Sequence, residues 1–470
     1  MKNGTRRTRI ITDPVHRVMN FGTDHDLHCS LFDIIDAPDF QRLRRISQLG
    51  LASHVFPGAT HSRFSHALGV AYLAHRVLEH LREWSDSETT VDEIQRASST
   101  VIMAAALHDI GHGPFSHSFE RVLHGTEWAP DHEDWTRAIV TDPISDIHRR
   151  LTKHGFDPEV IASLFSSKST DAKLDPLFAE IVSSQIDVDR MDYLLRDSHF
   201  GGVAIGEFDA QYLIHSMVIV SHGNERGPRS LGLTIKGVKA YEAFLLARQL
   251  MTRTLYYHPV VRVFEFMVEH IFRTVIQDID ELSDDKCLSP LIPEYFVRIS
   301  NHLRRANSGA TPKKQNVLQE DLQPYLALTD DVAWGLISGL ARSTNGNVAT
   351  RLAKRLIAHD PLESFTIERG KEDLLKRALE SHNFNDRHDF HLVDAKAVLY
   401  KADGHKSVFV MDEFAGIKEV AEHSEMIAAF RDRPETEWLL VILNDGKADD
   451  MLRVAKEGRF IHPESRVGRR

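Results

Sequence analysis

Four side chains of metal-binding type occur in an order that suits one shared site. His66 comes first, the adjacent pair His108 and Asp109 follows, and Asp189 comes last. Two imidazoles and two carboxylates can close one side of an octahedral site and leave positions open for water and substrate oxygens. This mixed set suits iron, manganese, zinc or nickel better than magnesium or calcium. Because such a metal polarises a phosphoryl oxygen and supplies hydroxide near neutral pH, the chemistry indicated is phosphoester hydrolysis.

Two alternatives to this ligand set remain open. Asp187 competes with Asp189, and only one of them should reach the metal because residues two apart in a helix point to different faces. A lone histidine in a helix is usually structural or exposed, and the chain has 28 histidines. The combination favours metal binding, since a Gly-His-Gly-Pro turn follows the doublet and a His precedes it.

Candidate acid–base residues follow the doublet within a short span. They are His112, His117, Glu120 and His132. An imidazole with a pKa near 6.5 can protonate a leaving oxygen, and a carboxylate can hold it in one tautomer. The alternative is an exposed polar loop, because residues 128–134 are rich in acidic side chains. We favour His132 as a catalytic residue.

Phosphate groups would have to be held without a Walker-type loop, because no G-x-x-x-x-G-K-[ST] segment occurs. Arginine forks and the metal would take that role. Arg63, Arg190 and Arg248 lie in the suspected motifs, and Arg63 shares a helical face with His66 three residues on. The alternative for each arginine is a solvated surface charge.

Helices must position most of these residues. Apolar spacing predicts helices over 31–49 (interrupted at Pro38), 62–84, about 97–109, from about 115, 187–197, and about 237–276. Alternating residues at 216–221 and 230–235 flank a Gly- and Pro-containing turn and predict a β-hairpin. Polar residues 304–315 predict a loop. After about residue 384 we predict strands at 391–400, 407–411 and 438–443, with a helix at 417–430.

Composition excludes several classes of protein. The chain has 470 residues, enough for two or three cores, and a net charge of −11 that disfavours a nucleic-acid partner. Two cysteines give no disulfide framework. No apolar run approaches the ~20 residues of a membrane span, and the N-terminus carries no signal core. We expect a cytoplasmic protein that has no membrane partner.

Several segments together resemble the HD-domain deoxynucleoside triphosphate triphosphohydrolases. This family includes bacterial dGTPase-like enzymes and a vertebrate member that joins a sterile-alpha-motif to its HD domain. The resembling segments are residues 35–44, 48–50, 55–59, 63–66, 108–117, 187–193, 196–197 and 248–258. The resemblance implies a mainly α fold, with an HD-domain helical core, a small β-hairpin and a C-terminal α+β lobe. We divide the chain into an arm and regulatory segment (1–50), the HD core (51–280), a helical extension (281–383) and the C-terminal lobe (384–470).

The resemblance also implies roles for individual residues. His66, His108, Asp109 and Asp189 fall on metal-binding positions, His132 on the catalytic His, and His117 on a second active-site His. Glu120 stands where the vertebrate member has Asp. Substrate-binding positions are Gln48, Leu49, Arg63, Arg190 (in place of a Lys), Tyr193, Asp197, Arg248 and Tyr256. Thr252 replaces a family His.

The implied reaction is hydrolysis of a deoxynucleoside triphosphate (dNTP) to a deoxynucleoside and inorganic triphosphate. One divalent transition metal (Fe, Mn, Zn or Ni) would bind each chain, and additional Mg could bind the triphosphate. Control of dNTP pools or nucleotide depletion against phage would be consistent cellular roles. Two alternatives remain: another HD phosphohydrolase acting on nucleotide monophosphates, modified nucleotides or nucleic acid, and a nucleotide-sensing scaffold with little catalysis.

A regulatory site is also implied. Asp36, Gln41, Arg44 and Arg9 fall where the vertebrate member binds an activating guanine nucleotide between subunits. A GTP or dNTP effector and a homo-oligomer of four or more chains would follow. The alternative is that Asp36 caps the helix that begins near Pro38 and that Arg44 forms a surface ion pair.

Overall fold

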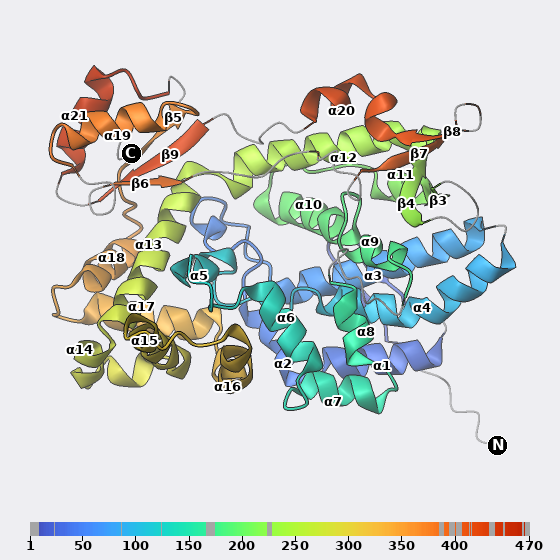
Figure 1. Cartoon of the computed structure of the whole chain (residues 1–470), viewed down its shortest axis with the longest axis horizontal. Helices are drawn as coiled ribbons and strands as arrows, with labels where there is room; N and C mark the ends of the chain where they lie inside the picture. Colours follow the sequence, from blue (N-terminus) through green and yellow to red (C-terminus); the bar gives the residue numbers. More distant parts are fainter. Residues whose placement is uncertain are drawn as a thin grey trace.

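The computed structural model describes residues 9–22, 24–85, 87–123, 125–165, 174–222, 228–384, 390–393, 400, 407–412, 414, 416–431, 438–444, 447–462 and 465. These residues form a helical body with three small sheets (Figure 1), so the predicted mainly α fold class is confirmed. None of the described helices has the length and apolar content that a membrane crossing requires.

Three long helices form the centre of the body. They are α3 (Arg63–Trp84), α4 (Glu88–Leu107) and α10 (Val188–Gly201). The side chains of α3 are buried on most of its faces, because α4 packs along one side and α10 along another. The turn after α4 needs Gly111, since a Cβ there would lie 2.2 Å from the backbone nitrogen of Thr136.

The N-terminal segment lies across this centre. It comprises a two-stranded hairpin, β1 (Ile11–Asp13) with β2 (Arg17–Met19), followed by α1 (His25–Ile35) and the short α2 (Pro38–Gln41). Pro38 occupies the first turn of α2, where its missing N–H costs nothing. The predicted interruption at Pro38 is therefore confirmed.

Further helices pack around these elements. They are α5 (His117–Glu120), α6 (His132–Thr141), α7 (Asp146–Lys153), α8 (Pro158–Ser163), α9 (Leu177–Val182), α11 (Ala210–His215), α12 (Val238–Met251) and α13 (Pro259–Gln277). Between α12 and α13 the backbone adopts a π-helical turn over Thr252–Tyr256. Such turns often mark functional sites.

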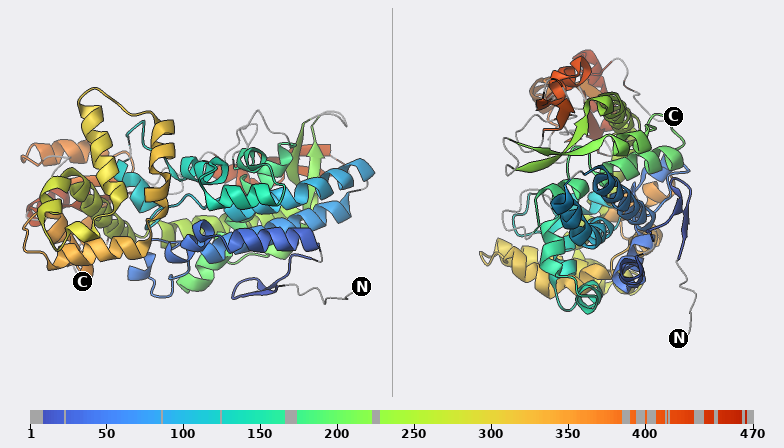
Figure 2. Two further views of the ribbon diagram at one scale, coloured as in Figure 1. Left: turned by 90° about the horizontal axis from the view of Figure 1, so that it is seen from below. Right: turned by 90° about the vertical axis from the view of Figure 1, so that its right-hand side faces the viewer.

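A helical extension follows from residue 279. It contains α14 (Ile279–Asp284), α15 (Glu294–Asn307), α16 (Lys314–Leu326), α17 (Asp330–Arg342) and α18 (Val348–Ile357). Figure 2 shows part of it projecting from one end of the body. The loop predicted at 304–315 is shorter than expected, because α15 continues to Asn307. Arg304 and Arg305 in the last turn of α15 favour this longer helix.

The C-terminal lobe is divided between two sheets. Strands β7 (Phe409–Asp412) and β8 (Gly416–Glu419) extend the hairpin of β3 (Met217–Ser221) and β4 (Arg229–Thr234) into one sheet of order β3-β4-β7-β8. The strand β4 pairs in parallel with β7, with Gly232 opposite Phe409. The helix predicted at 417–430 is therefore wrong in its first part, and only α20 (Glu425–Phe430) remains of it.

The second sheet has the order β5-β9-β6. It contains β5 (Ser364–Glu368), β9 (Trp438–Leu443) and β6 (Phe390–Val393), with α19 (Glu372–Glu380) and α21 (Ala448–Glu457) packed in a separate apolar core. The strand predicted at 391–400 lies partly outside the described residues. Strand β5 and helix α19 precede residue 384 in the chain and contribute to the same apolar core as β9.

Candidate active site

The four predicted metal ligands meet where three helices approach one another. His66 lies in the second turn of α3, His108 and Asp109 follow the end of α4, and Asp189 lies in the first turn of α10. Asp189 Oδ1 is 3.0 Å from His66 Nε2 and 3.4 Å from His108 Nε2. Asp109 Oδ1 is 3.5 Å from His108 Nε2.

Hydrogen bonds fix which nitrogen of each histidine faces the carboxylates. The Nδ1 atoms face acceptors at 2.8 Å, Asp192 Oδ2 for His66 and the Ala105 carbonyl for His108. Each Nδ1 therefore carries a proton, and each Nε2 is the nitrogen turned toward the carboxylates. Both Nε2 atoms are buried, and their polar neighbours are the carboxylate oxygens named above. The set fits a divalent transition metal, which would take the place of the proton between these nitrogens and oxygens.

The electrostatics of this cluster also favour a cation. Burial opposes protonation of His66, but Asp189 and Asp192 more than compensate and raise its pKa to about 10. Burial likewise opposes ionisation of Asp189, yet His108 and His66 hold its pKa far below the usual range. The carboxylates are thus ionised and impose a negative potential on the space between them.

The competing carboxylate Asp187 lies elsewhere. It caps α10 and accepts hydrogen bonds at 2.8 Å from the backbone nitrogens of Ser184 and Arg190. Asp187 also forms an ion pair with the Arg190 guanidinium. Because these donors saturate its oxygens, Asp189 is the carboxylate of the pair that faces the histidines.

A buried ion network behind His66 was missed by the sequence analysis. Asp192 accepts from His66 and from His16 in the β1–β2 turn, and it pairs with Arg196 through Nε at 2.8 Å. Arg196 in turn donates to Asp13 at 2.8 Å. The motif around 187–197 contained Asp192 and Arg196, but only the fold reveals that the N-terminal hairpin meets them.

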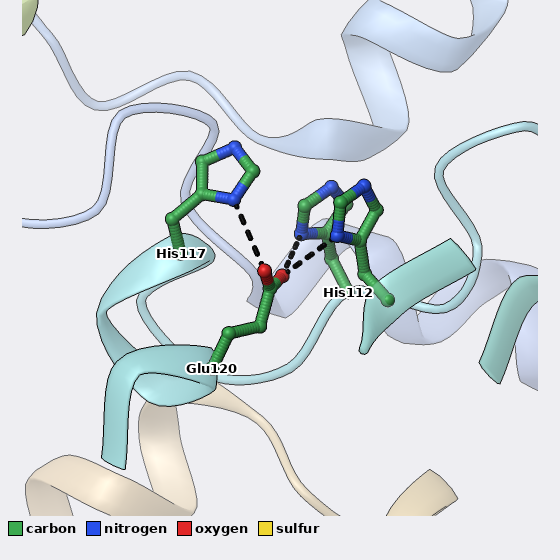
Figure 3. A group of neighbouring side chains, drawn as sticks. His112, His117 and Glu120 are labelled. Carbon is green, nitrogen blue, oxygen red and sulfur yellow. Dashed lines mark hydrogen bonds and ion pairs between the residues drawn. The ribbon is translucent and has the colours of Figure 1, made fainter. Parts of the chain in front are cut away.

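Glu120 is the centre of the predicted acid–base group (Figure 3). Its Oε1 is 3.0 Å from His132 Nδ1 and 3.4 Å from His112 Nδ1, and its Oε2 is 3.3 Å from His117 Nδ1. His112 Nε2 lies 3.2 Å from Asp109 Oδ1, so this group adjoins the predicted metal ligands. The structure therefore brings all four predicted acid–base residues together.

The histidines differ in their protonation. Burial lowers the pKa of His132, but Glu120 outweighs it and the net shift is upward. Burial together with the Arg63 charge lowers the pKa of His112 to about 4. Burial opposes ionisation of Glu120, yet its histidine partners hold its pKa well below the usual range. A protonated His132 paired with an ionised Glu120 can act as a general acid.

Three histidines and a carboxylate could also form a second metal site, but their geometry argues against it. The rings of His112 and His132 are stacked 4.1 Å apart at an interplanar angle of 16°. An imidazole lone pair lies in the ring plane, so two nearly parallel rings cannot both direct their lone pairs at one ion. The group is better suited to moving a proton.

Local backbone geometry sets these side chains in place. The capping box of Asp131 and Asp134 begins α6 at His132, which puts this residue in the first turn. Phe115 and Ser116 precede α5 with φ angles of 53° and 55°. Non-glycine residues rarely adopt this left-handed conformation, which occurs mostly where surrounding structure enforces it.

A cavity of about 520 Å³ adjoins both clusters. Of the predicted substrate-binding residues, those that line it are Gln48, Leu49, Arg63, Tyr193, Asp197, Arg248 and Tyr256. The exception is Arg190, which is absent from the lining and instead pairs with Asp187 and the Ser184 carbonyl. Thr252 also lines the cavity.

Contacts within the lining suggest separate tasks. Arg63 pairs with Asp109 and donates to Ser116 Oγ at 2.9 Å, next to the metal ligands. The Tyr256 hydroxyl donates to Asp197 Oδ2 at 2.8 Å, and the other oxygen of Asp197 is 2.8 Å from His61 Nε2. The arginine offers positive charge to a phosphate, whereas Tyr256 offers an aromatic ring and Asp197 offers a hydrogen-bond acceptor.

Part of the lining was not predicted. Arg121, Tyr257, Arg262 and Glu265 also face the cavity, and Glu265 Oε2 is 2.6 Å from Arg262 and 2.9 Å from Arg121. Arg121 adjoins Glu120 in sequence, and Arg262 follows the segment 248–258. Proximity to those motifs was the only available signal.

The predicted regulatory residues lie outside this cavity. Arg9 Nη1 is 2.8 Å from Asp36 Oδ2, and both side chains are more than half exposed. Gln41 donates to the Ile35 carbonyl and accepts from Arg44, each at 2.7 Å, while the Arg44 guanidinium stacks 3.5 Å from the Phe64 ring centroid. The residue before α2 is Ala37, so Asp36 does not cap that helix.

Two known protein families match parts of the chain. The HD domain matches residues 63–197 and the HD associated region matches residues 208–289. An uncharacterized protein of Bacillus subtilis, YwfO, is 37% identical over 284 residues, which cover 58% of this chain and 57% of the relative. The chain spans little more than half the length of this and several other curated relatives.

Several relatives carry a named activity. The deoxynucleoside triphosphate triphosphohydrolase SAMHD1 of Gallus gallus is 31% identical over 56% of this chain and 45% of the relative. The SAMHD1 homolog of Dictyostelium discoideum is 28% identical over 73% of this chain and 66% of the relative. Among solved structures, a phosphohydrolase of Bacteroides thetaiotaomicron has a similar fold, with a TM-score of 0.68, 22% identity and coverage of 93% of this chain and 99% of that chain.

Proposed function

We propose that this chain, whose residues 63–197 match the HD domain, is a metal-dependent hydrolase of deoxynucleoside triphosphates that releases inorganic triphosphate. The observation that carries this proposal is the convergence of two clusters on one cavity. The Nε2 atoms of His66 and His108 face two carboxylates, and the pair of Glu120 and His132 adjoins them through His112. A cavity of about 520 Å³ is within the usual range for a small-molecule site.

In the proposed mechanism, His66, His108, Asp109 and Asp189 hold the metal. When bound, the metal supplies a polarised phosphoryl oxygen and an acidified water. Arg63 and Arg248 contribute positive charge toward the triphosphate from the cavity wall. The pair of Tyr256 and Asp197 lies against the sugar.

Proton transfer falls to His132. The oxygen of a water bonds to the α-phosphorus, one of its protons passes to solvent and the other stays on the triphosphate. The bond from phosphorus to the 5′-oxygen breaks, the 5′-oxygen takes the proton of His132, and His132 is reprotonated from solvent. Glu120 keeps His132 protonated beforehand, because its carboxylate raises the His132 pKa. The products are a deoxynucleoside and triphosphate, so atoms and charges balance.

The named relatives support the substrate class, because two of them are deoxynucleoside triphosphate triphosphohydrolases by name. The test is chromatography of the products from each of the four dNTPs and from ATP and GTP, with Mn²⁺, Fe²⁺, Zn²⁺ or Ni²⁺ and with or without added Mg²⁺. We expect deoxynucleoside and triphosphate from dNTPs, and little product from ribonucleotides. Release of pyrophosphate or monophosphate instead would show that a different phosphorus–oxygen bond breaks and would refute the proposal.

We also propose that Arg9, Asp36, Gln41 and Arg44 form an effector site for GTP or a dNTP in a homo-oligomer. The exposure of Arg9 and Asp36 supports this, because a nucleotide can reach them without unfolding the arm. Arg44 presents a planar guanidinium of the kind that stacks on or donates to a base.

A further inference from the structure

The loop that carries the acid–base residues is held by a segment outside both matched family regions. These regions end at residue 289. Tyr325, near the end of α16, donates its hydroxyl to the Gly111 carbonyl at 2.6 Å and stacks on Trp135 of α6 with ring centroids 4.0 Å apart. The Leu328 carbonyl accepts from buried Arg42, which also donates to the His112 carbonyl. The helical extension therefore contacts the loop between Asp109 and His117 directly.

Asp330 makes the most informative of these contacts. It is buried at the start of α17, and its two carboxylate oxygens accept from different loops. Oδ1 accepts from the backbone nitrogen of Phe115 at 2.8 Å, and Oδ2 accepts from the backbone nitrogen of Ser47 at 2.9 Å. One side chain thus joins the segment before His117 to the segment before Gln48 and Leu49.

The two loops touch each other at the same place. Ser116 Oγ donates to the Ser47 carbonyl at 2.9 Å. A Cβ on Gly50 would lie 3.0 Å from the Phe115 carbonyl. Trp334, one turn further along α17, packs edge-on against the Phe115 ring with centroids 5.4 Å apart. Asp330 accepts from the backbone of Phe115 and Trp334 packs against its ring. Together they stabilise the left-handed conformation of Phe115.

We propose that Asp330 is a positioning residue that sets the width of the cavity between the 47–50 loop and the 112–117 loop, and so determines how strictly the sugar is selected. This inference rests on the proposed function, because Gln48 and Leu49 would contact the deoxyribose. Asp330 does not line the cavity, so it acts only through the loops that it joins.

The test compares Asp330→Asn with the neighbouring Asp331→Asn. Asn has one acceptor oxygen, so either Phe115 or Ser47 would face an NH₂ group and lose its hydrogen bond. Asp331 is a matched control because its side chain is 63% exposed and pairs only loosely with Arg45, at 3.4 Å. Two readouts are required: hydrogen–deuterium exchange of peptides covering 44–50 and 112–117, and kcat/KM for a dNTP and the matching NTP at saturating Mn²⁺.

We expect faster exchange of both peptides in Asp330→Asn, and wild-type exchange in Asp331→Asn. We expect kcat/KM on the dNTP to fall on the order of 10²-fold, as when a site is misplaced by about 1 Å. The ratio of kcat/KM for the dNTP to kcat/KM for the matching NTP should fall by roughly tenfold. Loosened contacts to the sugar would discriminate less well against the 2′-hydroxyl of the NTP. This ratio does not depend on the fraction of folded protein, so it separates positioning from simple loss of stability.

Unchanged exchange at either loop would overturn the inference, as would equal losses on all nucleotides. If wild type hydrolyses no nucleotide, the proposed function fails, and the exchange comparison alone then decides the role of Asp330. If Asp330→Asn does not fold, Asp330→Glu replaces it, because it keeps both acceptors on a longer arm. The same readouts then apply. We expect both peptides to exchange faster than in wild type, but more slowly than if their hydrogen bond to residue 330 were lost.

Discussion

Replacing Asp192 by Asn should weaken both the metal site and the fold. Asp192 is fully buried, and its oxygens accept from His66, His16 and Arg196. The bond to His66 Nδ1 fixes the tautomer that leaves Nε2 free to bind a metal. An Asn at this position offers one acceptor oxygen and directs an NH₂ group at a donor.

The expected magnitude follows from these contacts. Breaking a buried ion pair costs about 3–5 kcal/mol. Arg196 keeps Asp13 as a partner at 2.8 Å, so we expect the lower end, a loss of about 3 kcal/mol in the free energy of unfolding. Removal of the carboxylate behind a metal-binding His typically costs about 10–100-fold in metal affinity, or about 1.4–2.8 kcal/mol.

Two measurements test this reasoning. Isothermal titration with Mn²⁺ gives the metal affinity, and urea unfolding in the presence of a chelator gives the stability without metal. Asp284→Asn serves as a control, because Asp284 is exposed and lies on α14. If Asp192→Asn bound Mn²⁺ within about threefold of wild type, the expected effect of an orienting carboxylate would be absent, and our account of the network behind His66 would be wrong.

Three further predictions concern the ligands, the acid and the arm. Replacing His108 and Asp109 together by Ala should abolish metal binding and hydrolysis, and elemental analysis that still finds one metal per chain would contradict the assignment. His132→Ala should keep metal and nucleotide binding but lose about 10²–10⁴-fold in kcat; a rate close to wild type would point to His117. Because only protonated His132 donates, the rate should fall as pH rises through its raised pKa, and Glu120→Gln should move that fall to lower pH in a pH–rate profile. GTP or a dNTP should promote a homo-tetramer or larger assembly and raise the rate, whereas Asp36→Ala should remove this response with metal still bound; constant mass in light scattering across the titration would argue against an effector site.

The sequence was most informative where function depends on residues close together in the chain. His108 and Asp109 are adjacent, and His112, His117 and Glu120 follow within twelve positions, so one turn and one short helix bring them together. Helix α3 and the hairpin of β3 and β4 could also be predicted. Apolar residues recur at helical spacing along α3, and two apolar segments flank a Gly- and Pro-containing sequence in the hairpin.

Interactions through the backbone could not be predicted. Asp330 acts on the peptide nitrogens of Phe115 and Ser47, which lie 215 and 283 residues away, and no side-chain motif records such contacts. The role of Asp192 likewise depends on where the N-terminal hairpin packs. Residues 417–419 fall within the helix predicted at 417–430, whereas pairing with β7 makes them a strand.

The parallel pairing of β4 with β7 has a consequence for synthesis of the protein. Gly232 pairs with Phe409, so 177 positions separate the partners. At about 5–20 residues per second, a ribosome needs roughly 9–35 s to make the intervening chain. During that time β4 presents an open edge, the kind of surface at which nascent chains associate wrongly. Survival of the newly made protein should therefore depend on how well that edge is shielded until β7 has been made.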